Sequence, residues 1–383
     1  MEIENGLFIP SGYEIKDRIY KNDRHEIFKA LQVTDGHEVV LKITRPSVKD
    51  IKQISKLSHE YNILKAADHP GLVKVYALFS AEKSVCLVEE YFHGESLKSR
   101  LFRAPLTLDE FFSVSIALSE VLSYIHINGI IHKDINTNNI LIAEDNQIKL
   151  IDFGISSNNQ NEMHELNSVD LIEGILVYIS PEQSGRTSYS ISNSSDLYSL
   201  GIVMYEMLSG TPPFNSTDPM EVIHFHLSRN PIPLHLVDPK IPTGISKMVN
   251  VLLEKNPDDR YQSASGVLFD LKELREQLAE KKELSGFVPR RKDYYGKFKK
   301  TQRLYGRENE IKRLLHCVES LSSEKSILAL VSGYSGIGKS IVVKQIQSPV
   351  IEKSGMYLTG KFDQFKKNIP YFAFIEVFDE AIR

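Results

Sequence analysis

The 383-residue sequence has no tryptophan and only two cysteines, Cys86 and Cys317, which lie far apart in the chain. Two isolated cysteines cannot build a disulfide framework or a zinc site by themselves, so we expect a reducing compartment. The sequence also lacks an excess of either charge, because 46 lysines and arginines stand against 50 aspartates and glutamates, a formal net charge of -4. Nucleic acid is therefore not indicated as a partner.

Two further absences concern secretion and membranes. The chain does not begin with a basic segment followed by an apolar stretch, as a signal peptide would. No later apolar run approaches the roughly 20 residues that a membrane-spanning helix requires. We therefore predict a cytoplasmic protein without a membrane span. The composition, 42% hydrophobic and 25% charged, is typical of globular proteins, and the length is sufficient for two or three domains.

Hydrophobic periodicity predicts an N-terminal part that is rich in strands. Strand-like runs separated by turn residues cover 13–43, including a hairpin signal at Asp35-Gly36. A helix that uses Ser47 as its N-cap should follow. Two more strands are predicted at 72–80 and 84–91, which gives a small sheet carrying one helix.

A longer helical part begins at Thr107, which has the capping-box spacing to Glu110. Its first helix should end at Gly129, where a glycine can adopt the left-handed conformation. Two short strands at 140–142 and 148–151 interrupt the helical pattern, which then continues to about residue 284.

The stretch from 281 to 303 is basic and rich in turn residues, which predicts a linker. We interpret its charges as exposed surface, with a docking strip for an acidic ligand as the alternative. Beyond it, the pattern predicts a helix at 308–321 and a short apolar strand at 327–331.

One set of polar residues indicates chemistry rather than packing. The segment 132–139 reads HKDINTNN and contains Asp134 and Asn139, and Asp152 opens the Asp-Phe-Gly that follows the next hairpin. Phosphoryl transfer uses such a set, because one carboxylate orients the attacking hydroxyl while other oxygen atoms hold Mg²⁺ on the phosphates. The order of these residues is difficult to explain by core packing alone.

With these motifs in this order, residues from about 13 to 278 resemble the protein kinase family. The resemblance implies a bilobal α+β fold and the use of ATP and Mg²⁺. It assigns the catalytic role to Asp134 and the metal-binding role to Asn139 and Asp152. We expect His132 to pack in the core rather than to titrate in catalysis.

The resemblance also extends to the nucleotide site of the N-terminal part. Lys42, in Val-Val-Leu-Lys, is similar to the lysine that binds the α and β phosphates of ATP, and Glu60 to the glutamate that pairs with it. The segment from Glu90 to Phe92 is similar to the hinge that binds adenine through its backbone. Lys42 therefore counts as both a catalytic and a nucleotide-binding residue.

Three further features resemble structural positions of this family. Ser-Pro-Glu at 180–182 is similar to the motif that closes the activation segment. Arg260 matches the arginine that pairs with Glu182, and Asp196 matches a structural aspartate of a central helix. These features argue against a small-molecule kinase of related fold.

The sequence also departs from the family pattern. The segment 20–27, where a glycine-rich loop should cover the phosphates, contains no glycine, so side chains should obstruct or reshape that loop. Asn136 and Ile175 replace a lysine and a threonine that normally bond each other and the catalytic aspartate, which should remove one network. Lys133 replaces an arginine, which makes control by activation-loop phosphorylation less expected.

A second phosphate-binding pattern follows the predicted strand 327–331. The segment 333–340 reads GYSGIGKS, which is the P-loop pattern in its strand-loop-helix context. Backbone amide groups of such a loop surround phosphates, while the lysine contacts β and γ oxygens and the serine binds Mg²⁺. We therefore predict a nucleotide site formed by Gly333, Gly336, Gly338, Lys339 and Ser340, the last of which is also a metal ligand.

The residues around this loop resemble a particular ATPase. Residues 304–308 and 360–364 are similar to the ATPase region found behind the kinase in large bacterial and fungal signalling proteins, hybrids that can also carry a sensor region and a histidine kinase. The stretch after Ser340 is too short for a doubly wound ATPase and contains no aspartate that fits a Walker B position. We expect this ATPase part to be incomplete and inactive by itself.

The sequence thus predicts a protein kinase-like domain at 1–278, a basic linker at 279–303, and the N-terminal part of an α/β P-loop NTPase domain at 304–383. The main hypothesis is an ATP- and Mg²⁺-dependent kinase, of the serine/threonine type, that phosphorylates a protein in a two-component signalling pathway. Its further partners would be downstream domains of a longer parent chain. The alternative is a pseudokinase that binds nucleotide or partners without phosphotransfer.

Overall fold

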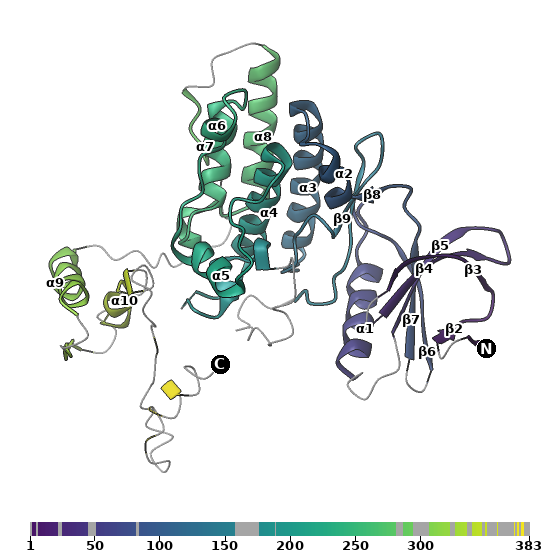
Figure 1. The fold of residues 1–383 in the computed structure, drawn as a ribbon, viewed down its shortest axis with the longest axis horizontal. Helices are drawn as coiled ribbons and strands as arrows, with labels where there is room; N and C mark the ends of the chain where they lie inside the picture. Colours follow the sequence, from purple (N-terminus) through teal and green to yellow (C-terminus); the bar gives the residue numbers. More distant parts are fainter. Residues whose placement is uncertain are drawn as a thin grey trace.

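The computed structural model of the chain describes residues 2–4, 7–21, 25–44, 51–81, 84–157, 176–187, 189–280, 286–293, 306–321, 326–334, 339–346, 349–350 and the single positions 358, 371, 374, 377 and 378. Within these residues, a lobe built on a sheet is followed by a lobe built of helices (Figure 1). The predicted change from strands to helices is therefore confirmed.

The N-terminal lobe is a five-stranded antiparallel sheet in the order β3-β4-β5-β7-β6. The strands are β3 (Tyr13–Lys21), β4 (His25–Gln32), β5 (Glu38–Thr44), β6 (Val75–Ala81) and β7 (Ser84–Glu90). Helix α1 (Ile51–Ala66) packs on one face, where Leu57 meets Val85 and Leu87. The β4–β5 hairpin predicted from Asp35-Gly36 is present, and Gly36 has a φ of 71°, which glycine adopts without strain. Ser47 lies outside the described residues.

A short hairpin precedes this sheet and was not predicted. Strand β1 (Glu2–Glu4) pairs with β2 (Leu7–Ile9). From β2, Phe8 packs against Phe28 on the face of the sheet opposite α1. Strands of three residues are too short to produce a recognisable alternation of polar and apolar residues, so the pattern gave no signal for them.

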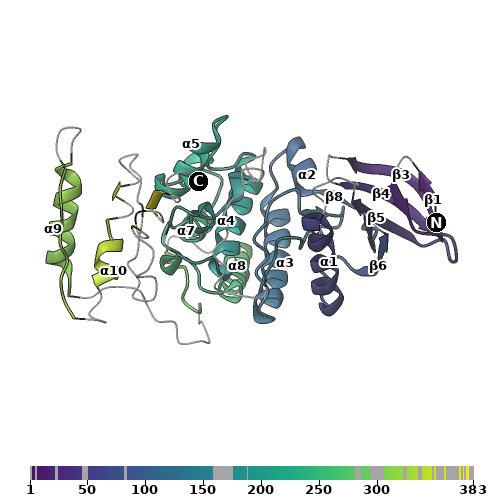
Figure 2. The ribbon, with the colours of Figure 1, turned by 90° about the horizontal axis from the view of Figure 1, so that it is seen from below.

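The C-terminal lobe is mainly helical. Its helices are α2 (Leu97–Arg103), α3 (Leu108–Ile127), α4 (Asn193–Ser209), α5 (Pro219–Ser228), α6 (Leu234–Val237), α7 (Thr243–Leu252) and α8 (Ala264–Ala279), with 3₁₀ turns η1 (Leu176–Tyr178), η2 (Pro181–Ser184) and η3 (Pro257–Asp259). Helix α3 packs along α8, and α4 contacts both α3 and α7 (Figures 1 and 2). Strands β8 (Glu95–Ser96), β9 (Ile140–Ile142) and β10 (Ile148–Leu150) form a small sheet in the order β10-β9-β8.

Helix α3 shows how local sequence sets an element. The Thr107 hydroxyl accepts a hydrogen bond from the Glu110 N–H (3.3 Å), and the Glu110 carboxylate accepts one from the Thr107 N–H (2.8 Å), which confirms the predicted capping box. Within the described residues, α3 is the one helix long and apolar enough to cross a membrane by length and composition. Most of its apolar residues, among them Phe111 and Leu118, are buried in the core of the C-terminal lobe, whereas Ile127 at its end is 83% exposed.

Residues 286–293, which we call the docked segment, belong to the predicted linker and pack against the C-terminal lobe. Phe287 is only 6% exposed and joins the core of that lobe. Asp293 accepts hydrogen bonds from the Gln262 N–H (2.6 Å) and the Ser263 hydroxyl (2.7 Å), immediately before α8 begins. The Arg290 N–H donates to the Asp270 carboxylate of α8 (2.8 Å). Part of the linker region is thus held by specific contacts.

Two helices follow in the region of the P-loop pattern, α9 (Glu308–Glu319) and α10 (Lys339–Lys344). Helix α9 confirms the helix predicted at 308–321. The strand predicted at 327–331 is wrong for the described part of the chain, where these residues pair with no other strand and Leu328 and Leu330 are each 86% exposed. An apolar run becomes a strand only when a neighbouring strand accepts its hydrogen bonds, and no described segment does so.

Candidate active site

Lys42 lies at the centre of the predicted nucleotide site. Its ammonium nitrogen is 2.9 Å from Glu60 Oε2 and 3.4 Å from Asp152 Oδ1. Glu60 Oε1 in turn accepts a hydrogen bond from the Phe153 N–H (3.1 Å). Three segments far apart in the sequence, namely β5, α1 and the Asp-Phe-Gly turn, therefore meet at one lysine.

The packing of α1 on the sheet explains why Lys42 and Glu60 lie close together. Lys42 pairs with Leu87 across the β5–β7 ladder, and Leu87 packs under Leu57 of α1, so Lys42 lies on the face of the sheet that α1 covers. Lys42 and Glu60 are 8% and 1% exposed. Burial lowers the pKa of Lys42, but the nearby carboxylates of Asp152 and Glu60 more than offset this and raise it, so the lysine remains charged.

Asp134 is held by two asparagines of its own loop. Asn136 Nδ2 donates to Asp134 Oδ1 and Asn139 Nδ2 donates to Asp134 Oδ2, each across 2.8 Å. The predicted loss of the network around Asp134 is thus corrected, because Asn136 still bonds the aspartate that a lysine would otherwise contact. Ile175, the other half of that prediction, lies outside the described residues.

The pKa values of Asp134 and Asp152 are shifted in opposite directions. Burial, together with the charge of Asp152, raises the pKa of Asp134 to about 6. The ammonium group of Lys42 lowers the pKa of Asp152 below its ordinary value despite burial. One carboxylate can therefore gain and lose a proton near neutral pH, while the other stays ionised.

The donor set of Asn139 and Asp152 fits a Mg²⁺ ion. Both Asn139 N–H groups are used by Asp134, through its backbone carbonyl (3.0 Å) and its carboxylate, which leaves the side-chain carbonyl oxygen as the atom for a metal. Asp152 is ionised, as a metal ligand must be. Mg²⁺ in phosphoryl-transfer sites usually takes one or two protein oxygens and completes its shell with phosphates and water, so two such ligands are sufficient.

Buried residues of the C-terminal lobe fix the loop that carries Asp134. Asp196, from the first turn of α4, accepts hydrogen bonds from the N–H groups of His132 and Lys133 (2.8 Å each) and contacts His126 Nε2 (2.8 Å). Lys133 has a φ of 69°, a strained conformation for a residue with a side chain, and these bonds compensate for it. His132 stacks edge to face on Phe153 at 4.5 Å, and burial lowers its pKa, in agreement with the predicted packing role.

A second buried link joins the end of the activation segment to the same lobe. Arg260 makes a bidentate pair with Glu182 (2.7 and 2.9 Å), and both side chains are 0% exposed. The neighbouring Gln183 donates from Nε2 to the Lys133 carbonyl (2.7 Å), which connects this segment to the catalytic loop. The predicted Glu182–Arg260 pairing is therefore present.

The hinge residues lie where β7 ends. The Glu90 N–H is already occupied, because it donates to the Lys74 carbonyl (2.8 Å). The Glu90 carboxylate accepts a hydrogen bond from Lys149 Nζ (2.8 Å), so its side chain is held in place by this contact. The Phe92 carbonyl accepts from the Gly94 N–H (2.9 Å), which turns the chain toward β8.

The strands that should carry the phosphate-covering loop pair along their length, with register shifts between Ile15 and Asp17 and between Arg18 and Tyr20 of β3. Strands β3 and β4 remain paired up to Lys21 opposite Glu26, and Tyr20 stacks near His25 with ring centres 5.8 Å apart. Residues 22–24, at the tip between them, lie outside the described residues.

The predicted P-loop site is described only in part. Lys339 begins α10 and donates from Nζ to the carbonyl oxygens of Gly333 and Tyr334 (2.8 Å each), so its ammonium group lies over the start of the loop. The backbone of Ser340 is in α10. Gly336, Gly338 and the side chain of Ser340 lie outside the described residues.

Comparison with known proteins decides the family. Residues 15–269 match the model of the protein kinase domain, and residues 303–383 match that of the AAA ATPase domain. The chain belongs to the protein kinase family. Its fold is the bilobal protein kinase fold, followed by the start of a P-loop NTPase domain.

The chain is similar to two kinds of relatives. The Mycobacterium tuberculosis serine/threonine-protein kinase PknB is 30% identical over 68% of this chain and 42% of its own length, and a probable serine/threonine-protein kinase of Clostridium perfringens is 30% identical over 70% and 39%. Hybrid signal transduction histidine kinase G of Dictyostelium discoideum is 28% identical over 73% of this chain. The chain spans only 11% of that protein, and less than half of the two bacterial ones.

Not all residues around Lys42 were predicted. Glu89, on β7, is buried near Lys42, Glu60 and Asp152, whose charges act on its carboxyl group, and it was missed because an acidic residue next to Glu90 is typical of an exposed surface. Gln183 was missed because its partner is a backbone carbonyl. Its place directly after the Ser-Pro-Glu motif was the available signal.

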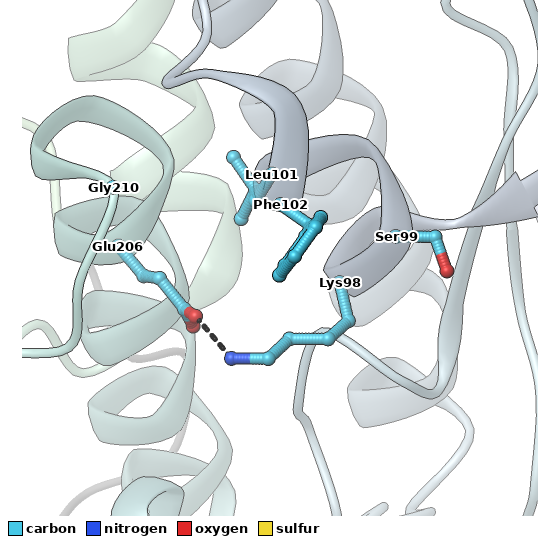
Figure 3. A pocket seen from close by; sticks show the side chains of 6 residues that line it. All are labelled: Lys98, Ser99, Leu101, Phe102, Glu206 and Gly210. Carbon is cyan, nitrogen blue, oxygen red and sulfur yellow. Dashed lines mark hydrogen bonds and ion pairs between the residues drawn. The ribbon is translucent and has the colours of Figure 1, made fainter.

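An open pocket lies away from the predicted site residues, between α2 and α4 (Figure 3). An ion pair of 2.9 Å between Lys98 and Glu206 crosses it, and Phe102 beside it is 94% exposed. Its lining residues are Lys98, Ser99, Leu101, Phe102, Glu206 and Gly210. None of them is a predicted site residue.

Proposed function

We propose that residues 1–278 bind Mg²⁺ and ATP and transfer the γ-phosphoryl group to a serine or threonine hydroxyl of a protein. The observation that carries the proposal is the position of Lys42, 2.9 Å from Glu60 and 3.4 Å from Asp152. Catalysis of phosphoryl transfer consists mainly of positioning and charge stabilisation, and it needs this lysine close to the metal-binding aspartate. A buried ion pair is costly to maintain without a use, which supports a functional role.

Each side chain has a distinct part in the proposed reaction. Asp134 orients the acceptor hydroxyl and takes its proton, for which a pKa of about 6 is suitable at neutral pH. Lys42 contacts the phosphate oxygens and neutralises charge. Asn139 and Asp152 would hold Mg²⁺, which supplies further neutralisation of the phosphates when it is bound.

The backbone of the hinge would hold the base. The Glu90 N–H is bonded to Lys74 and the Phe92 carbonyl to Gly94, so we assign the Glu90 carbonyl oxygen and the Phe92 N–H to adenine. An acceptor and a donor two residues apart on an extended segment match the amino group and ring nitrogen of adenine. This arrangement supports ATP as the nucleotide.

A second nucleotide site is proposed at 304–383, with Gly333, Gly336, Gly338, Lys339 and Ser340 around the phosphates and Ser340 on Mg²⁺. The match to an AAA ATPase domain supports it. We propose that residues 279–303 connect the two parts, and that this part needs further domains of a longer chain for hydrolysis. ATP hydrolysis by the 383-residue chain that disappears in Lys339→Ala would contradict that need.

The second candidate function is a pseudokinase. The observation that favours it is the absence of glycine from 20–27, since glycine lets the backbone approach phosphates closely. Such a module would bind nucleotide or a signalling partner without transfer.

One experiment separates these functions. The chain with Lys339→Ala, which disables the second site, is incubated with γ-labelled ATP and Mg²⁺ alone or with a generic acceptor protein, and its melting temperature is measured with and without the nucleotide. We expect labelling and stabilisation, and we expect labelling to disappear and stabilisation to persist when Asp134→Asn is added. Stabilisation without labelling supports the pseudokinase, and labelling that survives Asp134→Asn refutes the proposed mechanism.

A further inference from the structure

The docked segment contacts the turn that carries Arg260. Arg290 Nη1 donates a hydrogen bond to the Asp259 carbonyl oxygen (2.6 Å), and the Asp293 carboxylate accepts one from the Gln262 N–H (2.6 Å). The Gln262 side chain in turn donates from Nε2 to the Arg260 carbonyl oxygen (2.8 Å). The docked segment therefore holds the backbone on both sides of Arg260.

Two features of the docked segment are costly and show that its position is specified. Arg290 has a φ of 68°, a strained conformation for a residue with a side chain. The Asp293 side chain is 1% exposed, so a carboxylate is removed from water. Space for it exists because residue 266 of α8 is glycine. A Cβ atom at Gly266 would lie 2.5 Å from Asp293 Oδ1 and 2.8 Å from Asp293 Cβ.

Arg260 connects this turn to the loop that carries the proposed catalytic base. Its guanidinium group is paired with Glu182 through two hydrogen bonds (2.7 and 2.9 Å). The next residue, Gln183, donates from Nε2 to the carbonyl oxygen of Lys133 (2.7 Å), which directly precedes Asp134. Coupling between distant parts of a protein is carried by hydrogen-bonded and packed series of this kind. One such series runs from the docked segment to the Asp134 loop.

The docked segment lies outside the part of the chain that matches the protein kinase domain, residues 15–269. It also precedes the match to the AAA ATPase domain, which begins at residue 303. A stretch between the two matched regions is thus packed onto the turn that the catalytic loop depends on.

We propose that Arg290 and Asp293 are positioning residues for phosphotransfer, and that the docked segment keeps the Asp134 loop in its active arrangement by fixing the turn of Arg260. The inference rests on the proposed function, because it assumes that Asp134 takes part in the transfer. Release of the segment should slow transfer and leave ATP binding in place, since Lys42 lies in the other lobe.

The first test releases the docked segment without changing any of its residues. Gly266→Ala places a methyl group where Asp293 lies, and alanine itself favours a helix more than glycine does. Rates with γ-labelled ATP and a generic acceptor protein are measured on the full chain carrying Lys339→Ala, which disables the second site. The ATP stoichiometry from calorimetry corrects each rate for the folded fraction. We expect kcat to fall about 10-fold and the KM for ATP to change less than about 2-fold.

The second test removes one contact of the docked segment. Arg290→Met loses the donor to the Asp259 carbonyl oxygen and should lower kcat in the same way. Arg290→Lys keeps a cationic donor and should restore most of the rate. The matched control is Arg291→Met, because Arg291 is the exposed neighbour and its loss changes the net charge equally. It should leave kcat unchanged.

Hydrogen–deuterium exchange separates positioning from a general loss of stability. Peptides covering 286–293 report release of the docked segment, and peptides covering 132–139 report the Asp134 loop. We expect both to exchange faster in Gly266→Ala and in Arg290→Met, with the exchange of α1 unchanged. Release of the segment with an unchanged kcat would overturn the inference, and so would an equal loss of kcat in Arg291→Met.

These measurements also distinguish the inference from the function beneath it. If the chain without these substitutions transfers no phosphate to the acceptor or to itself, the proposed function fails. Exchange at 132–139 then still decides whether the docked segment positions the loop, and unchanged exchange there on release refutes it. Should Gly266→Ala fail to fold, the comparison of Arg290→Met with Arg290→Lys keeps the test decisive.

Discussion

Asn136 donates a hydrogen bond from its side-chain nitrogen to Oδ1 of Asp134 across 2.8 Å. The other end of the same amide, Asn136 Oδ1, accepts from the N–H groups of Asn138 (2.9 Å) and Asn139 (3.2 Å). One uncharged side chain therefore holds Asp134, the proposed catalytic base, and the backbone of its loop together. A lysine at this position, as in most serine/threonine kinases, would add a positive charge beside Asp134 instead.

This contact predicts the pH dependence of phosphotransfer. Because Asp134 has a raised pKa of about 6 and must be ionised to accept a proton, activity should fall as the pH decreases through about 6. Asn136→Asp places a negative charge beside Asp134 and should move this acid limb up by about 1 pH unit. Asn136→Lys places a positive charge there and should move it down by about the same amount. Initial rates measured as a function of pH give, for each variant, the pH at which activity has fallen to half on the acidic side.

The control for this experiment is Asn128→Asp, because Asn128 follows α3 and changes the net charge equally without a contact to Asp134. Its pH profile should match that of the unchanged chain. Shifts of the same sign in Asn136→Asp and Asn136→Lys would show that the charge next to Asp134 does not set the limb.

We expect the buried ion pair of Arg260 with Glu182 to contribute to the stability of the C-terminal lobe. Arg260 and Glu182 are fully buried, so removing one partner leaves the other charge without compensation. We expect Arg260→Met or Glu182→Leu to lower the free energy of unfolding by about 3–5 kcal/mol each. The double variant should lose clearly less than the sum of the two. Urea unfolding curves measure these values.

The matched control is the exposed pair of Arg103 with Glu95, for which Arg103→Met should give no measurable change. Equal losses in the buried and exposed pairs would mean that burial does not determine the effect. Strict additivity in the Arg260 and Glu182 cycle would mean that the two side chains are not coupled.

The docked segment should stabilise the lobe on which it packs. Phe287 is 6% exposed in the core, so Phe287→Ala should cost about 3 kcal/mol. Val288, the next residue, is 58% exposed, and Val288→Ala should have little effect. Hydrogen–deuterium exchange of peptides covering 286–293 and the start of α8 reports the loss locally. Unchanged exchange in Phe287→Ala would show that the segment does not depend on this contact.

Residues in regular elements were predictable because their neighbours in sequence are also their neighbours in space. The capping box of Thr107 with Glu110 is local, and hydrophobic periodicity placed α1, α3 and β3 to β7. Motif order was sufficient to propose Lys42, Glu60, Asp134 and Asp152 as one group.

The remaining features depend on contacts that span the chain. Asp293 meets Gln262 and Ser263 only because the docked segment folds back on α8, and no local pattern encodes that. Glu89 is buried because α1 covers its face of the sheet. The strand expected at 327–331 requires a partner strand, which periodicity cannot supply.

The pH dependence of stability provides a separate test of the environment of Glu89. Burial raises the pKa of Glu89 from an ordinary 4.5 to about 8 in the folded chain, with Glu60 on α1 and Asp152 after β10 acting in the same direction and Lys42 on β5 against them. In the unfolded chain the carboxyl group ionises near its ordinary value. Between these two values the folded state binds more protons than the unfolded state, so stability should fall as the pH rises through this interval.

Glu89→Gln removes this titration and leaves every other group in place. The free energy of unfolding of the variant minus that of the unchanged chain should therefore grow as the pH rises from about 5 to about 8, by up to a few kcal/mol, and then level off. Urea unfolding at four pH values in this range measures the difference, and the contribution of Asp134 cancels because both proteins contain it. Glu38→Gln, at a far less buried position, should give a difference that does not depend on pH over the same range. A constant difference for Glu89→Gln would mean that Glu89 is ionised throughout this range and that burial does not control its pKa.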